Sequence, residues 1–104
     1  KVVFDEKAKK KFLTIDAIVL FQELAKKFDG LKSFEGKESS LETILKEVAE
    51  NAGLKLGKLA QPLRVAITGQ TTSPGIYETL ILIGKKRVLE RLQRAIEMIR
   101  SAQN

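Results

Sequence analysis

Apolar residues recur at steps of three and four over residues 41–52, and this spacing limits the segment to a helix that buries one face. Ser39 and Glu42 stand at the spacing of a capping box, in which each side chain accepts a backbone N–H of the first turn. Gly53 suits the left-handed position that ends many helices. The sequence therefore predicts an amphipathic helix over 39–53, whose buried face is formed by Leu41, Ile44, Leu45, Val48, Ala49 and Ala52.

The same period recurs along most of the chain and predicts an all-α fold. A helix is expected to begin after the N-cap Thr14 and to end at Asp29-Gly30, and a shorter charged segment over 5–13 precedes it. Two more are expected over 58–68 and 85–100. Their apolar faces carry Ile18, Phe21, Leu24, Ala25, Phe28 and Leu31, then Leu59, Leu63 and Ile67, then Val88, Leu92, Ala95, Ile96 and Ile99.

Two places leave alternatives open. Pro62 lacks an N–H and fits only the first turn of a helix, so the regular part of the third long helix is expected to begin near Ala60. Ser73, Pro74 and Gly75 read as the N-cap and first two residues of a short helix that ends at Gly84. The run 80–83 within it fits a buried strand equally well, although the caps around it favour a helix.

Composition narrows the chemistry of the chain. Its 104 residues are enough for one domain with a core. It contains no cysteine and no histidine, so disulfides, thiolate chemistry and the commonest general base are missing. No metal-ligand spacing occurs, and no apolar run reaches the roughly 20 residues of a membrane span. We therefore expect no catalytic residue, no metal and no membrane contact here, and the start without Met suggests a piece of a longer, cytoplasmic protein.

The positive charge is confined to the second half. Residues 1–53 contain ten Lys, no Arg and ten acidic residues, which sum to zero. Residues 54–104 contain four Lys, five Arg and three Glu, which sum to +6 and account for the whole net charge. Arginine's planar fork suits phosphates and base edges. This segregation indicates a polyanionic partner, with a merely solvated basic surface as the alternative.

Residues 56–69, which contain Gln61-Pro62-Leu63-Arg64, resemble the C-terminal anticodon-binding domain of bacterial-type glutamyl-tRNA synthetases. Residues 73–78, 82–87 and 90–92 match further blocks of that domain in the same order. The helix over 40–53 agrees more loosely, and residues 1–36 agree only in helical character. The resemblance therefore rests mainly on the second half of the chain.

The resemblance implies a helical cage domain, spanning 1–104 as one unit, that grips the anticodon loop of tRNA-Glu and packs on a preceding helical domain of the same chain. A monomer is expected. The family's catalytic core uses ATP and Mg²⁺ to activate glutamate, but its motifs are absent, so this piece is expected to need no cofactor and to be inactive alone. The competing hypothesis is a basic helical adaptor that binds an acidic protein partner.

The resemblance also implies RNA-binding residues. Arg64 falls where the family places an anticodon-contacting arginine; alternatively, it is a surface residue paired with a nearby Glu. Ser73, Pro74, Gly75 and Ile76 match the loop that touches splayed anticodon bases, and many family members have Thr in place of Ser73. A helix N-terminus with a close-approaching Gly75 and the apolar surface of Pro74 and Ile76 suits a base. The alternative there is a plain capping motif.

Several residues form a weaker second set. Lys46 and Leu56 align loosely with RNA-contacting positions, although an arginine is more usual in place of Lys46. Tyr77 is a candidate for stacking on a base or for a place in the core. A phosphate-facing stripe or a solvated face is expected from Arg87, Arg91 and Arg94.

Overall fold

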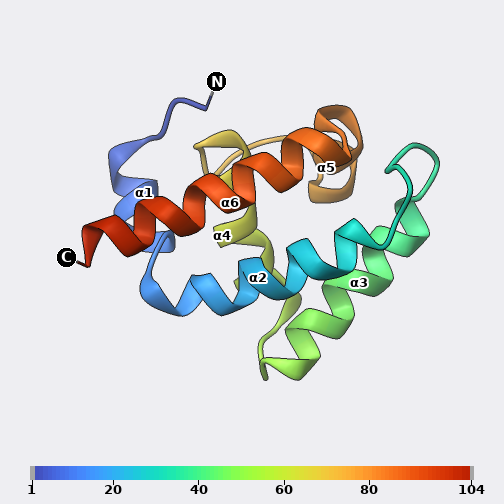
Figure 1. Ribbon diagram of the computed structural model, residues 1–104, viewed down its shortest axis with the longest axis horizontal. Helices are drawn as coiled ribbons and strands as arrows, with labels where there is room; N and C mark the ends of the chain where they lie inside the picture. The colour runs from blue at the N-terminus through green and yellow to red at the C-terminus, as the bar shows by residue number, and fades with distance from the viewer. Residues whose placement is uncertain (1, 104) are drawn as a thin grey trace.

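The computed structural model describes residues 2–103, and all regular structure within this range is helical. The helices are α1 (Glu6–Phe12), α2 (Ile15–Asp29), α3 (Glu38–Asn51), α4 (Leu56–Thr68), α5 (Ile76–Ile83) and α6 (Lys85–Ala102). Figure 1 shows how the helices pack together, and buried side chains of α2 to α6 form one hydrophobic core. None of the described helices is long and apolar enough to cross a membrane. The all-α prediction is confirmed.

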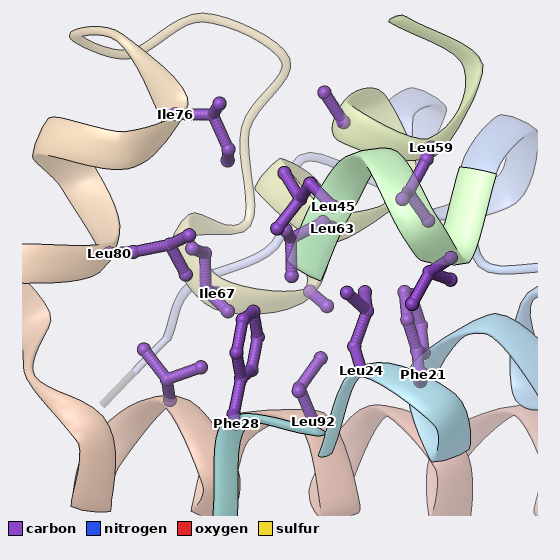
Figure 2. Close-up of a cluster of buried hydrophobic side chains, with 14 of the residues drawn as sticks. Phe21, Leu24, Phe28, Leu45, Leu59, Leu63, Ile67, Ile76, Leu80 and Leu92 are labelled. Atoms are coloured by element: carbon purple, nitrogen blue, oxygen red, sulfur yellow. The ribbon is translucent and has the colours of Figure 1, made fainter. Parts of the chain in front are cut away.

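The core forms where α4 is enclosed by the other helices. Leu59, Leu63 and Ile67 of α4 are fully buried, and Figure 2 shows them facing side chains from the helices around them. Phe34, which precedes α3, adds an edge-to-face contact with Phe28 at 5.2 Å between ring centroids. The α4 helix is therefore held on several sides, and this fixes the direction of the residues on its remaining face. The partners labelled in Figure 2 are Phe21, Leu24 and Phe28 of α2, Leu45 of α3, Ile76 and Leu80 of α5 and Leu92 of α6.

The most extensive helix pairing joins α2 and α6, which are far apart in the sequence (Figure 1). Buried residues of both helices, such as Phe21, Leu24 and Leu92, belong to the same hydrophobic core. At the end of the pair, the Lys85 ammonium donates to the Asp29 backbone carbonyl at 3.1 Å and lies 3.7 Å from its carboxylate. The second half of the chain, which carries the excess charge, is thus packed directly onto the first.

The N-terminal segment before α1 is anchored on the turn that ends α4. The amide of Asp5 donates to the carbonyl of Gly69 at 2.8 Å, and the Gln70 side-chain amide donates to the carbonyl of Val3 at 3.4 Å. Gly69 has φ +81°, and a Cβ there would overlap the Val3 backbone. This close approach places the entering chain beside the loop that leads to α5.

Two helix starts differ from the sequence prediction. The α3 helix begins at Glu38 with Lys37 as its N-cap, so Ser39 does not form the predicted capping box. The Leu41 amide already donates to the Lys37 carbonyl, which puts Ser39 inside the first turn. Gly53 does take a left-handed conformation, with φ +68° after the C-cap Ala52, as predicted.

The α4 helix is regular from Leu56 onward, so the expected later start near Ala60 is wrong. Pro62 lies inside the helix with its ring buried, where apolar contacts favour it. Because proline has no N–H, the Lys58 carbonyl lacks its usual helical donor. Lys58 is exposed, so water can donate to that carbonyl instead. The run 80–83 is helical and ends at Gly84, which has φ +90°, so the helical alternative is confirmed.

Candidate nucleic-acid interface

Arg64 and Ser73, predicted as site residues from separate sequence blocks, are in direct contact. The Arg64 Nε–H donates to Ser73 Oγ at 2.8 Å, and its Nη1 donates to Gln61 Oε1 at 2.9 Å. Arg64 is half-buried on α4, and its side chain is bonded to these two neutral acceptors rather than to the Glu of the alternative hypothesis. The guanidinium is therefore oriented without being neutralised, which leaves its positive charge available to a ligand.

Ser73 is not the N-cap of α5, contrary to the sequence prediction. The cap is Gly75, and α5 begins at Ile76. Ser73 Oγ instead donates to the Pro74 carbonyl at 2.8 Å while it accepts from Arg64. Pro74 and Gly75 are exposed, and the first amides of α5 follow them directly. A helix N-terminus leaves such amides without intrahelical acceptors, so this loop offers donors to an approaching base or phosphate.

Ile76 occupies a different environment from its neighbours in the loop. Its side chain is only 8% exposed and belongs to the hydrophobic core. Apolar contact with a base is therefore left to the exposed Pro74, and Ile76 can contribute its backbone N–H. The burial of Ile76 anchors the first turn of α5 beneath the loop.

A groove of about 510 Å³ adjoins the loop. It lies between the N-terminal segment, the end of α4, α5 and α6, and its rim includes Val3 and Leu82, which are 77% and 73% exposed. Ser73, Pro74 and Arg91 also line it. An apolar rim beside hydrogen-bonding groups is suited to an unstacked base.

The predicted arginine stripe on α6 is divided by the structure. Arg91 is half-buried, and its Nη1 donates to the backbone carbonyl of Ile67 at 2.8 Å, near the C-terminus of α4. Arg87 and Arg94 are exposed and share a surface hollow with Arg91 and Glu90. Arg91 thus joins α6 to α4, whereas Arg87 and Arg94 are the freer cations of the stripe.

Leu56 lies apart from the Arg64–Ser73 contact, and Lys46 belongs to another helix. Lys46 is exposed on α3. Leu56 is half-buried at the start of α4, about 12 Å along the helix axis from Arg64 at 1.5 Å per residue. Leu56 therefore stands outside this cluster, and Lys46 takes no part in its hydrogen bonds.

Tyr77 is half-buried and packs against the core, which is the second of the two roles expected for it. Burial raises the pKa of its hydroxyl, and the negative charge of Glu42 on α3 raises it further. Both effects disfavour the tyrosinate.

This environment predicts a measurable titration. Tyr77 is the single tyrosine and the chain has no tryptophan, so tyrosinate absorbance near 295 nm reports it alone. The folded chain is expected to titrate above pH 10.0 and the urea-unfolded chain close to it. Because the folded state keeps its proton longer, the associated stability is present below the unfolded pKa and is lost as pH rises through the folded pKa.

Glu42→Gln should lower the folded midpoint, whereas Glu50→Gln, on an exposed position of the same helix, should leave it in place. Equal midpoints in the folded and unfolded wild-type chain would contradict the assigned burial of Tyr77.

Sequence reasoning missed Gln61 and Thr79. Gln61 precedes Arg64 by three residues on α4, and this helical spacing was an available signal. Thr79 is a polar residue within an apolar helix, and its Oγ1 donates to the Pro74 carbonyl at 3.1 Å. Among the residues that the structure describes, no group of three or more acidic side chains is placed to hold a metal ion.

The sequence model of the family described as "anticodon binding domain" matches residues 1–96. The chain belongs to the anticodon-binding domain family. Within this anticodon-binding domain, the match covers all the residues of the Arg64–Ser73 contact and the loop before α5.

Similar proteins are longer than this domain. The chain is 40% identical over 96 residues to a glutamate–tRNA ligase of Thermodesulfovibrio yellowstonii, covering 92% of the chain and 20% of the ligase. It is 44% identical over 92 residues to that of Symbiobacterium thermophilum, covering 88% and 18%. A crystal structure of a glutamate tRNA ligase from Elizabethkingia meningosepticum superposes with a TM-score of 0.82 and 34% identity, covering 92% and 18%. The anticodon-binding domain thus spans about a fifth of these relatives.

Proposed function

We propose that this domain recognises the anticodon loop of tRNA-Glu, with Arg64 and the Ser73–Ile76 loop as the reading site. The observation that carries the proposal is the Arg64–Ser73 hydrogen bond, which brings two separate sequence blocks into one contact beside an apolar groove. Single-stranded RNA loops are read by splaying bases onto side chains and bonding to their edges. Exposed Pro74 offers apolar surface to a splayed base, and the oriented Arg64 guanidinium and the first amides of α5 offer hydrogen bonds to its edge.

The different environments of the arginines support one surface that recognises bases and another that binds phosphates. Arg64 is fixed by two neutral acceptors, a state suited to bidentate contact with a base edge. Arg87 and Arg94 are exposed on α6 and suit phosphates, whose contacts position RNA without selecting sequence. The second-tier candidates are Lys46, Leu56, Tyr77 and Arg91. Tyr77 and Arg91 already make contacts within the domain, and Leu56 lies away from Arg64 on the same helix.

The proposal extends to the protein that contains this domain. Because the relatives are glutamate–tRNA ligases about five times its length, we assign it to an enzyme of that activity, in which other domains bind ATP and Mg²⁺ and activate glutamate. A preceding helical domain of the same chain would adjoin this one. The whole protein is proposed to be a monomer in the cytoplasm.

Binding to a labelled anticodon stem-loop of tRNA-Glu tests the function directly. The chain should bind it more tightly than a stem-loop with the same stem and an altered anticodon, and fluorescence anisotropy measures both dissociation constants. Each wrong base typically costs about 1–3 kcal/mol, or roughly 5- to 150-fold in affinity. A basic adaptor for acidic proteins would bind both RNAs alike, so equal affinities would contradict anticodon recognition.

A further inference from the structure

Thr79 is a buried polar side chain in a core that is otherwise apolar among the described residues. It is 6% exposed, and it lies on α5 next to the fully buried Leu80. Its Oγ1 lies 3.1 Å from the Pro74 carbonyl, to which it donates, and 3.5 Å from Ser73 Oγ. Burial of a hydroxyl is costly unless it is hydrogen-bonded, so this placement fixes the hydroxyl on the loop.

The direction of this hydroxyl is unusual for a helical threonine. Thr43 and Thr68 donate to the carbonyl four residues earlier, that of Ser39 and Arg64 respectively. This is the ordinary local bond of threonine in a helix. Thr79 instead reaches past Gly75, whose carbonyl already accepts the Thr79 amide, to the loop outside the helix. The bond therefore ties α5 to the loop rather than to itself.

A continuous set of contacts leads from Thr79 to Arg64. The Pro74 carbonyl accepts from both the Thr79 and the Ser73 hydroxyls. Ser73 Oγ in turn accepts the Arg64 Nε–H at 2.8 Å. Since Thr79 and Ser73 hold the same carbonyl, the Ser73 hydroxyl is kept in the orientation that leaves a lone pair toward Arg64.

We infer that Thr79 is a positioning residue of the anticodon site: it holds Pro74 and Ser73 so that Ser73 can orient the Arg64 guanidinium. This inference rests on the proposed function for its RNA consequence, while the positioning itself is a property of the free domain. Groups ordered before binding lose less freedom on binding, so loss of this tie should weaken anticodon preference without contact between Thr79 and RNA.

The test uses Thr79→Val, which keeps the shape and removes the hydroxyl, and Thr79→Ser, which keeps the hydroxyl. Thr43→Val on α3 is the matched control, since it removes an exposed helical hydroxyl whose hydrogen bond stays within α3. Each chain is checked by circular dichroism. The first readout is the affinity ratio for the tRNA-Glu and altered stem-loops. The second, without RNA, is protection of the Arg64 Nε–H from solvent exchange, observed by ¹⁵N NMR.

Thr79→Val should lower the affinity ratio by about two- to twelvefold, the range for one hydrogen bond, and should speed exchange of the Arg64 Nε–H. Thr79→Ser and Thr43→Val should keep both values near wild type. Unchanged ratio and protection in Thr79→Val would overturn the inference and leave the proposed function intact. If the wild-type chain showed no anticodon preference, the proposed function would fail, and the exchange measurement would still decide whether Thr79 positions Arg64.

Discussion

Gly69→Ala is expected to lower the free energy of unfolding by about 2–5 kcal/mol, combining backbone strain with a steric clash. Gly69 has φ +81°, a conformation that residues with a Cβ rarely adopt. The added Cβ would also overlap the Val3 carbonyl carbon and oxygen. These are backbone atoms of the segment held by the Asp5–Gly69 hydrogen bond, so they cannot move aside without breaking it.

Gly53→Ala separates the two contributions. Gly53 has φ +68°, and nothing lies within 4 Å of the position where its Cβ would stand. In this variant the free energy of unfolding should therefore fall only by the cost of the left-handed backbone conformation, about 1–2 kcal/mol. Urea unfolding followed by circular dichroism measures both. If the two alanine variants were equally stable, the close packing of the N-terminal segment on Gly69 would be wrong.

Arg64→Ala should remove about 1–3 kcal/mol of discrimination between the tRNA-Glu stem-loop and one with an altered anticodon, the usual effect of losing a bidentate base contact. Its guanidinium is held by Ser73 at Nε and by Gln61 at Nη1, so the Nη2 group that remains for RNA is oriented in advance. Arg64→Lys should recover little of the preference, because an ammonium lacks the planar fork. Dissociation constants for both RNAs at several salt concentrations give the result.

Arg94→Ala is the matched control for charge. Arg94 is exposed on α6, so its loss should weaken both RNAs alike and flatten the log–log salt dependence by roughly 0.7 if one single-strand phosphate contact disappears. Arg91→Ala is a poorer control because it also breaks the bond to the Ile67 carbonyl. A variant at Arg64 that lost affinity for both RNAs without a change in their ratio would make Arg64 a phosphate contact.

The long helices α2, α3, α4 and α6 were predictable because each buries one face at helical spacing. The apolar faces of α2, α4 and α6 reach the core as expected. Helix starts were less predictable. The α3 helix begins earlier than its capping box suggests, after the turn in which the Lys37 amide donates to the Phe34 carbonyl. Phe34 itself is 1% exposed in a segment without helical spacing, so only tertiary packing reveals it as core.

The residues of the candidate site were predictable from the sequence, but the hydrogen bonds between them were not. Arg64 and Ser73 were both identified through family resemblance, but their mutual bond depends on how α4 and the loop meet in space. The bond from Arg91 to the Ile67 carbonyl could not be predicted for the same reason, because the two residues are 24 positions apart in the chain. Side-chain hydrogen bonds to distant carbonyls leave no periodic trace in a sequence.

The pairing of α2 with α6 has a consequence for how the chain is made. The α2 helix is complete at Asp29, whereas α6 begins at Lys85 (Figure 1). At roughly 5–20 residues per second, a ribosome needs about 3–11 s to add the residues between them. Throughout that interval the apolar face of α2, with Phe21 and Leu24, lacks the helix that covers it most extensively. Closure of this core is therefore a late event of synthesis, and the nascent first half is the form most in need of protection from aggregation.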